Sequence, residues 1–301
     1  MKKFKRLLLA VAFLLCVVAV SAGDDEVQYA PYYSVAKVQG TVEEVRQDVV
    51  VALELQGFEV IGEYHPGNND NLYTICYTRQ DLSDIALKFE DRGALASVLK
   101  IGLFKENGQV EISMINPMYL FYAYLLDGME NYEKSLIAIS DDCIDAMATL
   151  STELVSFGGL ETKEDLQKYH YKIMMPYFTD PEELKEFNSF EEGLTTIRKN
   201  LEAKKGNTVK IYEQVYEGEK VAVFGVGLLD EGKGEGHFLP IIGERNVAAM
   251  PYEIILQGNE ATMLHGKFRI ALHWPELTMG TFMKIMGTPG DIEDTMELLT
   301  E

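Results

Sequence analysis

The chain has 301 residues, which suits one large domain or two of about 140 residues. With 48 acidic and 27 basic residues its formal net charge is −21, and so acidic a surface argues against nucleic acids and anionic membranes as partners. Hydrophobic residues make up 47% of the chain, which is typical of a globular protein with a proper core.

The first 22 residues are typical of a secretory signal peptide. Basic residues between Lys2 and Arg6 precede an apolar run from Leu7 to Val20, and Val20 and Ala22 suit the last positions before a cleavage site. The apolar run is shorter than the roughly 20 residues that a membrane span needs. We therefore expect a periplasmic or secreted protein with no stable membrane insertion after cleavage.

The three cysteines do not predict a disulfide framework. Cys16 lies in the signal peptide after two leucines, which are too bulky for a usual lipid-attachment box, so we do not expect a lipoprotein. Cys76 lies in a strand-like stretch and Cys143 in a helix-like one. The two could pair outside the cytosol, but we favour buried free thiols.

Two stretches predict the same helix-then-strand unit, namely GTVEEVRQDVVVALELQGFEVIGEY and NSFEEGLTTIRKNLEAKKGNTVKIYEQ. Each begins with a hydroxyl residue, Thr41 or Ser189, followed by two glutamates, which is an N-cap arrangement. Apolar residues at helical spacing follow, and a glycine, Gly57 or Gly206, is predicted to end each helix. Alternating strand patterns come next. The chain therefore contains an internal repeat.

The correspondence continues in chain order. LYTICYT matches VAVFGVGL, and FEDRGALASVLKIGL matches IGERNVAAMPYEIIL. A polar turn follows in both, and the next predicted strands are QVEISMIN, residues 109–116, and KFRIALHW, residues 267–274. Pro117 and Pro275 then take the same place, the end of a strand and the first turn of a helix.

The order of elements predicts an α+β protein, because strands arrive as hairpins and helices group on one face. We expect two tandem copies, residues 23–156 and residues 157–301, each a curved antiparallel sheet with helices packed on one face. The stretch YFTDPEELKEFN is interpreted as an insertion between the first strand of the second copy, KYHYKIMM, and its first helix.

These motifs resemble the domain-of-unknown-function family 302. Gly57-Phe58 and Asn116-Pro117 match its pattern in the first copy, and Met250-Pro251 and Trp274-Pro275 match in the second. The family cysteine after the proline is absent, since Tyr252 stands there. The resemblance implies a fold like that of the TATA-binding protein and implies no activity.

Five residues are candidates for a ligand-binding site: Arg92, Arg245, Trp274, His273 and His237. Asp91-Arg92 and Glu244-Arg245 recur at matching positions, which favours a salt-bridged corner over an arginine that grips a carboxylate ligand. His273 and Trp274 have no counterpart in the first copy, although a tryptophan that caps a core is the commoner case. His237 lies in the glycine-rich LLDEGKGEGHFLP, interpreted as a flexible connector and alternatively as a mobile lid.

No histidine pair has metal-ligand spacing, so no metal site is predicted, and the sequence names no cofactor. Aromatic and methionine residues in the last helix of each half favour a binding module for a small apolar or amphipathic molecule; these are Tyr119, Phe121, Tyr122, Tyr124, Met279, Phe282, Met283 and Met286. The same residues could form the core between the halves. One alternative is an envelope enzyme with His237 or His273 as base and Arg245 as anion holder, and another is a scaffold for protein partners.

Overall fold

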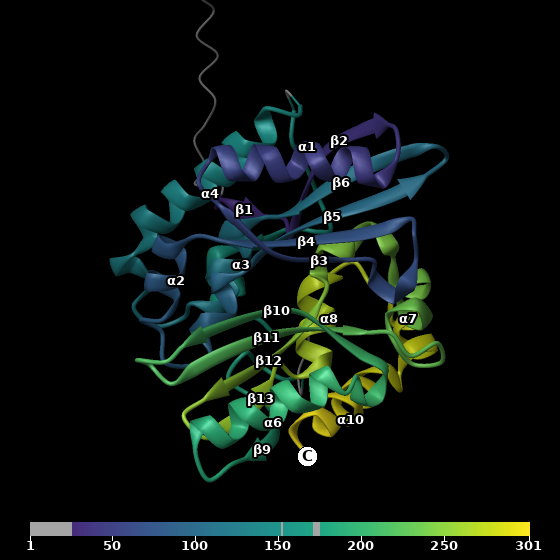
Figure 1. Cartoon of the computed structure of the whole chain (residues 1–301). Helices are drawn as coiled ribbons and strands as arrows, with labels where there is room; N and C mark the ends of the chain where they lie inside the picture. Colours follow the sequence, from purple (N-terminus) through teal and green to yellow (C-terminus); the bar gives the residue numbers. More distant parts are fainter. Residues whose placement is uncertain (1–25, 152, 171–174) are drawn as a thin grey trace, which may run out of the picture.

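The computed structural model describes residues 26–151, 153–170 and 175–301, so the predicted signal peptide lies outside the described residues. Within them the protein is α+β, as predicted: two antiparallel sheets face each other and helices cover their outer faces (Figure 1). No helix of this described part is long and apolar enough to cross a membrane.

The first half, up to residue 170, carries a six-stranded sheet in the order β3-β4-β5-β6-β2-β7. A two-stranded ribbon of β1 and β8 lies beside it. The strands are β1 (Gln28–Tyr29), β2 (Tyr32–Gln39), β3 (Glu59–Tyr64), β4 (Leu72–Thr78), β5 (Leu99–Glu106), β6 (Gln109–Ile115), β7 (Val155–Phe157) and β8 (Glu161–Thr162). The helices are α1 (Val42–Leu55), α2 (Gln80–Ala86), α3 (Pro117–Tyr124), α4 (Glu133–Ala148) and α5 (Lys163–Gln167), with short 3-10 helices η1 (Pro66–Asn68), η2 (Gly93–Ser97) and η3 (Met129–Asn131).

The second half, residues 175–301, carries a five-stranded sheet in the order β10-β11-β12-β13-β9. Its strands are β9 (Glu182–Glu186), β10 (Thr208–Tyr216), β11 (Val221–Leu228), β12 (Tyr252–Gln257) and β13 (Glu260–Met263). Its helices are α6 (Phe190–Glu202), α7 (Glu235–Ile242), α8 (Gly266–His273), α9 (Met279–Phe282) and α10 (Thr288–Thr300), with η4 (Lys205–Asn207), η5 (Glu244–Ala249) and η6 (Met283–Ile285).

The two sheets share one strand order, apart from the added β7. In each, the strand before the first helix lies beside the last strand of the second hairpin, β2 beside β6 and β9 beside β13. Each first hairpin also carries a register shift at the same place, where one extra residue, Ile61 or Ile211, bulges from the edge strand. The halves are therefore alike in topology as well as in sequence pattern.

The predicted helix caps are present. Thr41 accepts from the backbone of Glu44, whose carboxylate bonds back to Thr41, which completes a capping box. Ser189 accepts from the backbone of Glu192 in the same way. Gly57 takes the left-handed conformation after α1, with φ of +76°. After α6 the non-glycine residue Lys204 takes that conformation first, with φ of +52°.

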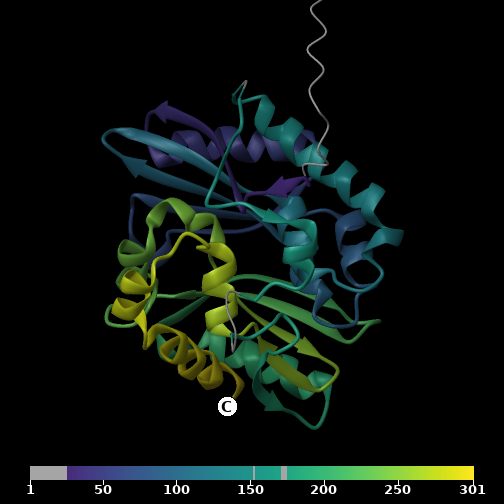
Figure 2. The ribbon, with the colours of Figure 1, turned by 180° about the vertical axis from the view of Figure 1, so that it is seen from behind.

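The inner faces of the two sheets pack together, with the connectors η2 and η5 between them (Figures 1 and 2). Gly102 in β5 permits this approach, because a Cβ atom there would lie 2.6 Å from the backbone nitrogen of Ala248. The hydrophobic core around α1 and α3 also includes Ile255 and Leu272 from the second half. This core therefore extends from the first half into the second.

The structure corrects the predicted strand at residues 267–274, which is helix α8 at Gly266–His273. The last strand of the second hairpin is instead β13. Pro275 follows α8, whereas Pro117 is the first residue of α3. Alternating apolar residues fit a strand, but they also fit a helix that is buried on nearly every side. The counterpart of Asn116 is His265, since each caps its helix by accepting from the backbone two residues later.

The first strand of the second sheet also differs from the prediction. It is β9, which lies inside the stretch interpreted as an insertion. Residues 168–170 of the predicted strand KYHYKIMM belong to no strand, and residues 171–174 lie outside the described residues. The predicted boundary between residues 156 and 157 falls within β7, which pairs with β2 of the first sheet. The glycine-rich connector is a turn followed by α7.

Candidate functional site

Helix α8 borders a pocket, a buried polar region and the hydrophobic core. Its helical periodicity places the residues that contact each of these on a different face. Lys267, Ile270, Ala271 and Trp274 recur at helical spacing and line a pocket on one side. On another side, Arg269 and His273 enter a buried polar region between the two sheets. Phe268 and Leu272 join the hydrophobic core of the first half. One helix thus connects a pocket, a polar junction and a core.

The pocket beside Trp274 is almost wholly apolar. It encloses about 60 Å³ and is lined by Met175, Lys267, Ile270, Ala271, Trp274, Leu277, Met279 and Phe282. Trp274 is 4% exposed, and its indole N–H donates to the Gly243 carbonyl at 3.1 Å. Because this bond and the burial fix the ring, Trp274 forms a rigid wall.

A second hollow is also lined by Trp274 and Leu277. It encloses about 300 Å³ and mixes apolar residues from the end of α7 with the polar side chains of Asn246, Glu276, Thr278 and Thr281. We call the two spaces the apolar pocket and the polar hollow. One tryptophan therefore borders both an apolar space and a more polar one.

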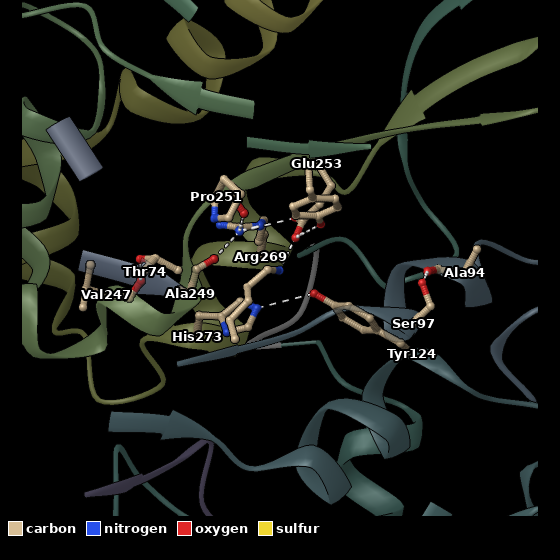
Figure 3. Close-up of polar contacts among 12 residues, drawn as sticks. Thr74, Ala94, Ser97, Tyr124, Val247, Ala249, Pro251, Glu253, Arg269 and His273 are labelled. Carbon is tan, nitrogen blue, oxygen red and sulfur yellow. Dashed lines mark hydrogen bonds and ion pairs between the residues drawn. The ribbon is translucent and has the colours of Figure 1, made fainter. Parts of the chain in front are cut away.

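Three charged residues and a tyrosine are buried where the halves meet, and we call them the junction cluster: Lys100, Glu253, Arg269 and Tyr212. Lys100 and Arg269 both pair with the carboxylate of Glu253, and the hydroxyl of Tyr212 donates to it at 3.4 Å. Figure 3 shows Arg269 pointing at the carbonyl oxygens of Ala249 and Pro251 as well. Lys100 and Glu253 are each the second residue of their strands, β5 and β12.

Arg269 is held by its surroundings on several sides. Its guanidinium carbon lies 3.7 Å from the centre of the Tyr252 ring, which is a cation–π contact. Among the described residues its Nε and Nη1 atoms have no hydrogen-bond partner. Because a buried charge is costly unless it is paired, the Glu253 carboxylate is what makes this arginine tolerable in the interior.

His273 lies deep in the same region. The hydroxyl of Tyr32 is 3.3 Å from Nδ1 and the hydroxyl of Tyr124 is 3.4 Å from Nε2, as Figure 3 shows for Tyr124. Burial, followed by the positive charges of Arg269 and Lys100, holds the pKa of His273 well below its ordinary value. The imidazole is therefore neutral at pH 7 and enclosed by tyrosines. Tyr124 and His273 are each the last residue of their helices, α3 and α8.

The other predicted site residues do not gather around His273. His237 is exposed on α7, and no contact joins it to His273 among the residues that the structure describes. Arg92 is buried, donates to the Phe178 carbonyl at 2.9 Å and pairs with Asp91. Arg245 pairs with the buried Glu111 of β6 at 2.6 Å and stacks on Phe157. Both arginines therefore join segments of the two halves.

The aromatic residues predicted for a binding site divide between two locations. Tyr119, Phe121, Tyr122 and Tyr124 of α3 are buried in the core. In the second half, Met279, Met283 and Met286 are between 53% and 60% exposed. Only the second set borders the apolar pocket, through Met279 and its neighbour Phe282.

Glu235 is a buried acid that the sequence analysis missed. It begins α7, is fully buried, accepts from the hydroxyl of Tyr64 at 2.8 Å, and accepts from the backbone of Gly67 at 3.0 Å. Burial raises the pKa of Glu235 to about 7, although these hydrogen bonds oppose the effect. Its position at a helix start gave no signal of burial, because acids there are usually solvated.

Neither cysteine of the described chain forms a disulfide. Cys76 and Cys143 are free and buried, as favoured from the sequence. Burial raises the pKa of Cys143 to about 12, so its thiol is unreactive at neutral pH. Within the described ranges no group of histidine, cysteine or acidic side chains could hold a metal ion.

Comparisons with known proteins give a limited result. No family model matches the sequence, and no curated protein matches it. A similar solved structure is that of an uncharacterised conserved DUF302 protein from Bacillus stearothermophilus, with 18% identity and a TM-score of 0.31. The match covers 40% of this chain and 94% of that protein.

Proposed function

We propose that the protein is a non-enzymatic binding module for a small apolar or amphipathic molecule, which binds beside Trp274. The observation that carries this proposal is the apolar pocket, whose wall is one face of α8 and whose tryptophan is fixed by a hydrogen bond. Ligand sites are commonly concave and apolar, with a few polar groups that fix orientation. The two spaces around Trp274 fit that description.

The dimensions limit the size of the ligand. The apolar pocket encloses about 60 Å³, which suits a short alkyl group or the edge of one ring. The polar hollow encloses about 300 Å³, at the lower end of the usual range for ligand sites. A short amphipathic molecule could therefore place its apolar end in the pocket and its remainder at the rim.

We also propose that the halves are diverged tandem copies of a family 302 unit and that the chain is exported by its signal peptide. The internal repeat supports the first point through the common strand order and the bulges at Ile61 and Ile211. The amino-terminal sequence supports the second. Export would bring the pocket into contact with small molecules of the envelope or the medium.

The enzyme alternative gains no support from the geometry. His273 is buried, and His237 is exposed and does not contact it among the described residues. Arg245 forms an ion pair with Glu111. The scaffold alternative has one observation in its favour, the exposed methionines Met279, Met283 and Met286. Size-exclusion chromatography with light scattering tests it, since a stable dimer or a co-purifying protein would favour a scaffold.

The proposal is tested by filling the pocket. Trp274 is the only tryptophan, so its fluorescence reports on ligands that enter. We expect 1-hexanol to change the emission saturably in the wild-type protein, and we expect Ala271→Leu to weaken that binding at least tenfold. Val51→Leu, on the exposed face of α1, is the control. No saturable response to any short apolar probe would refute the proposal.

A further inference from the structure

We infer that the ligand of the apolar pocket carries an anionic head group, a carboxylate on a short apolar body, and that Lys267 binds it. This inference rests on the proposed function and specifies its ligand. Among the residues that the structure describes, Lys267 is the only charged one that lines the pocket, and the other lining side chains are apolar. Lys267 lies in the first turn of α8 and is exposed.

The ammonium group of Lys267 is available to a ligand. Within the described parts of the chain it forms no ion pair. Burial raises the pKa of Glu182 and the charge of Lys267 opposes this rise, while burial and then Lys267 lower the pKa of His265. Other basic side chains around the interior already form ion pairs, such as Arg245 with Glu111 and Lys100 with Glu253. A long side chain of this kind covers an apolar wall with its methylenes and keeps its charge in water.

The acidic net charge of the molecule is the reason why a lysine at the pocket bears on the charge of the ligand. At a formal charge of −21, the surface repels anions in general, so an anionic ligand needs a local cation to bind. A neutral apolar ligand would need none.

The magnitude of the effect is modest because Lys267 is exposed. Ion pairs between exposed groups contribute little, and salt screens them. We therefore expect a preference for the carboxylate over the matched alcohol of about threefold to fivefold at low salt. The preference should disappear at high salt, where the Debye length falls to about 3 Å.

The experiment compares hexanoate, 1-hexanol and hexylamine on the full mature protein, by Trp274 fluorescence and calorimetry. We expect wild type to bind hexanoate most tightly and hexylamine most weakly. Lys267→Gln should bind hexanoate and 1-hexanol equally, because it lacks the charge that distinguishes the two probes. Lys284→Gln, which removes the same charge from exposed η6 outside the pocket, should keep the preference.

The outcomes separate the two claims. If all three probes bind equally to the wild-type protein, the inference about Lys267 is wrong and the proposed pocket stands. If hexylamine binds best, the ligand is cationic and the inference is again overturned. If no probe binds at all, the proposed function itself fails.

Discussion

Glu235 shows how one buried acid can make the stability of the protein depend on pH. Its carboxylate receives two hydrogen bonds from the first half, yet burial still raises its pKa to about 7 from the usual 4.5. A carboxyl with a raised folded-state pKa contributes stability that is present below its unfolded pKa and is lost as pH rises through the folded value. The protein should therefore be less stable at pH 8 than at pH 5 on account of this residue.

We predict that Glu235→Gln flattens the pH dependence of stability. Between pH 5 and pH 8 the wild-type protein should lose roughly 2–3 kcal/mol that the variant keeps. Urea unfolding at the two pH values measures this difference. Glu219→Gln, at an exposed position, should retain the wild-type slope. Parallel profiles for wild type and Glu235→Gln would mean that Glu235 is ionised normally in the folded protein.

At the scale of single residues, the sequence singled out Trp274 and His273 as candidates but did not indicate that Arg269, Glu253 and Glu235 are buried. Trp274 was conspicuous because it is the only tryptophan of the chain. The charged residues carry no local mark of burial, since a lysine or glutamate in a strand is equally common on a solvated face. Only the meeting of two sheets, which is a long-range event, places Lys100 against Glu253.

At the scale of elements, local chemistry decided which predictions held. Helix α1 and its cap were predictable because Thr41 and Glu44 act within one turn. Strand β9 was missed because it is a charged edge strand, with acidic residues and a lysine in place of apolar alternation. Helix α8 was misread because its burial on several faces produces an alternation that a strand also shows.

The capping box of α1 offers a test at this scale. We expect Thr41→Ala to destabilise the protein by about 1 kcal/mol, because the backbone amide of Glu44 loses its acceptor. Val51→Ala, on the exposed face of the same helix, should change stability by less than about 0.5 kcal/mol. Thermal or chemical unfolding measures both. An equal effect of the two changes would indicate that the cap contributes nothing.

At the scale of the whole molecule, the halves depend on each other through their packed inner faces. A Cβ atom at residue 102 would meet the backbone of η5, so we expect Gly102→Ala to cost roughly 1–3 kcal/mol through overpacking. Gly218→Ala is the control, since nothing lies within 4 Å of its added atom.

The same experiment tests whether the halves unfold together. Trp274 fluorescence follows the second half and far-ultraviolet circular dichroism follows both. We expect the two signals to give one coincident transition that shifts in Gly102→Ala. Separate transitions, with Gly102→Ala affecting neither, would show that the halves are independent.

The positions of Lys100 and Glu253 determine what this face can recognise. They occupy the same place in their respective strands and face each other at the centre of the junction. If the first half met a second copy of itself through this surface, lysine would oppose lysine, and the second half would set glutamate against glutamate. Buried like charges cost several kcal/mol. In this pairing each half is matched to the other and mismatched to itself.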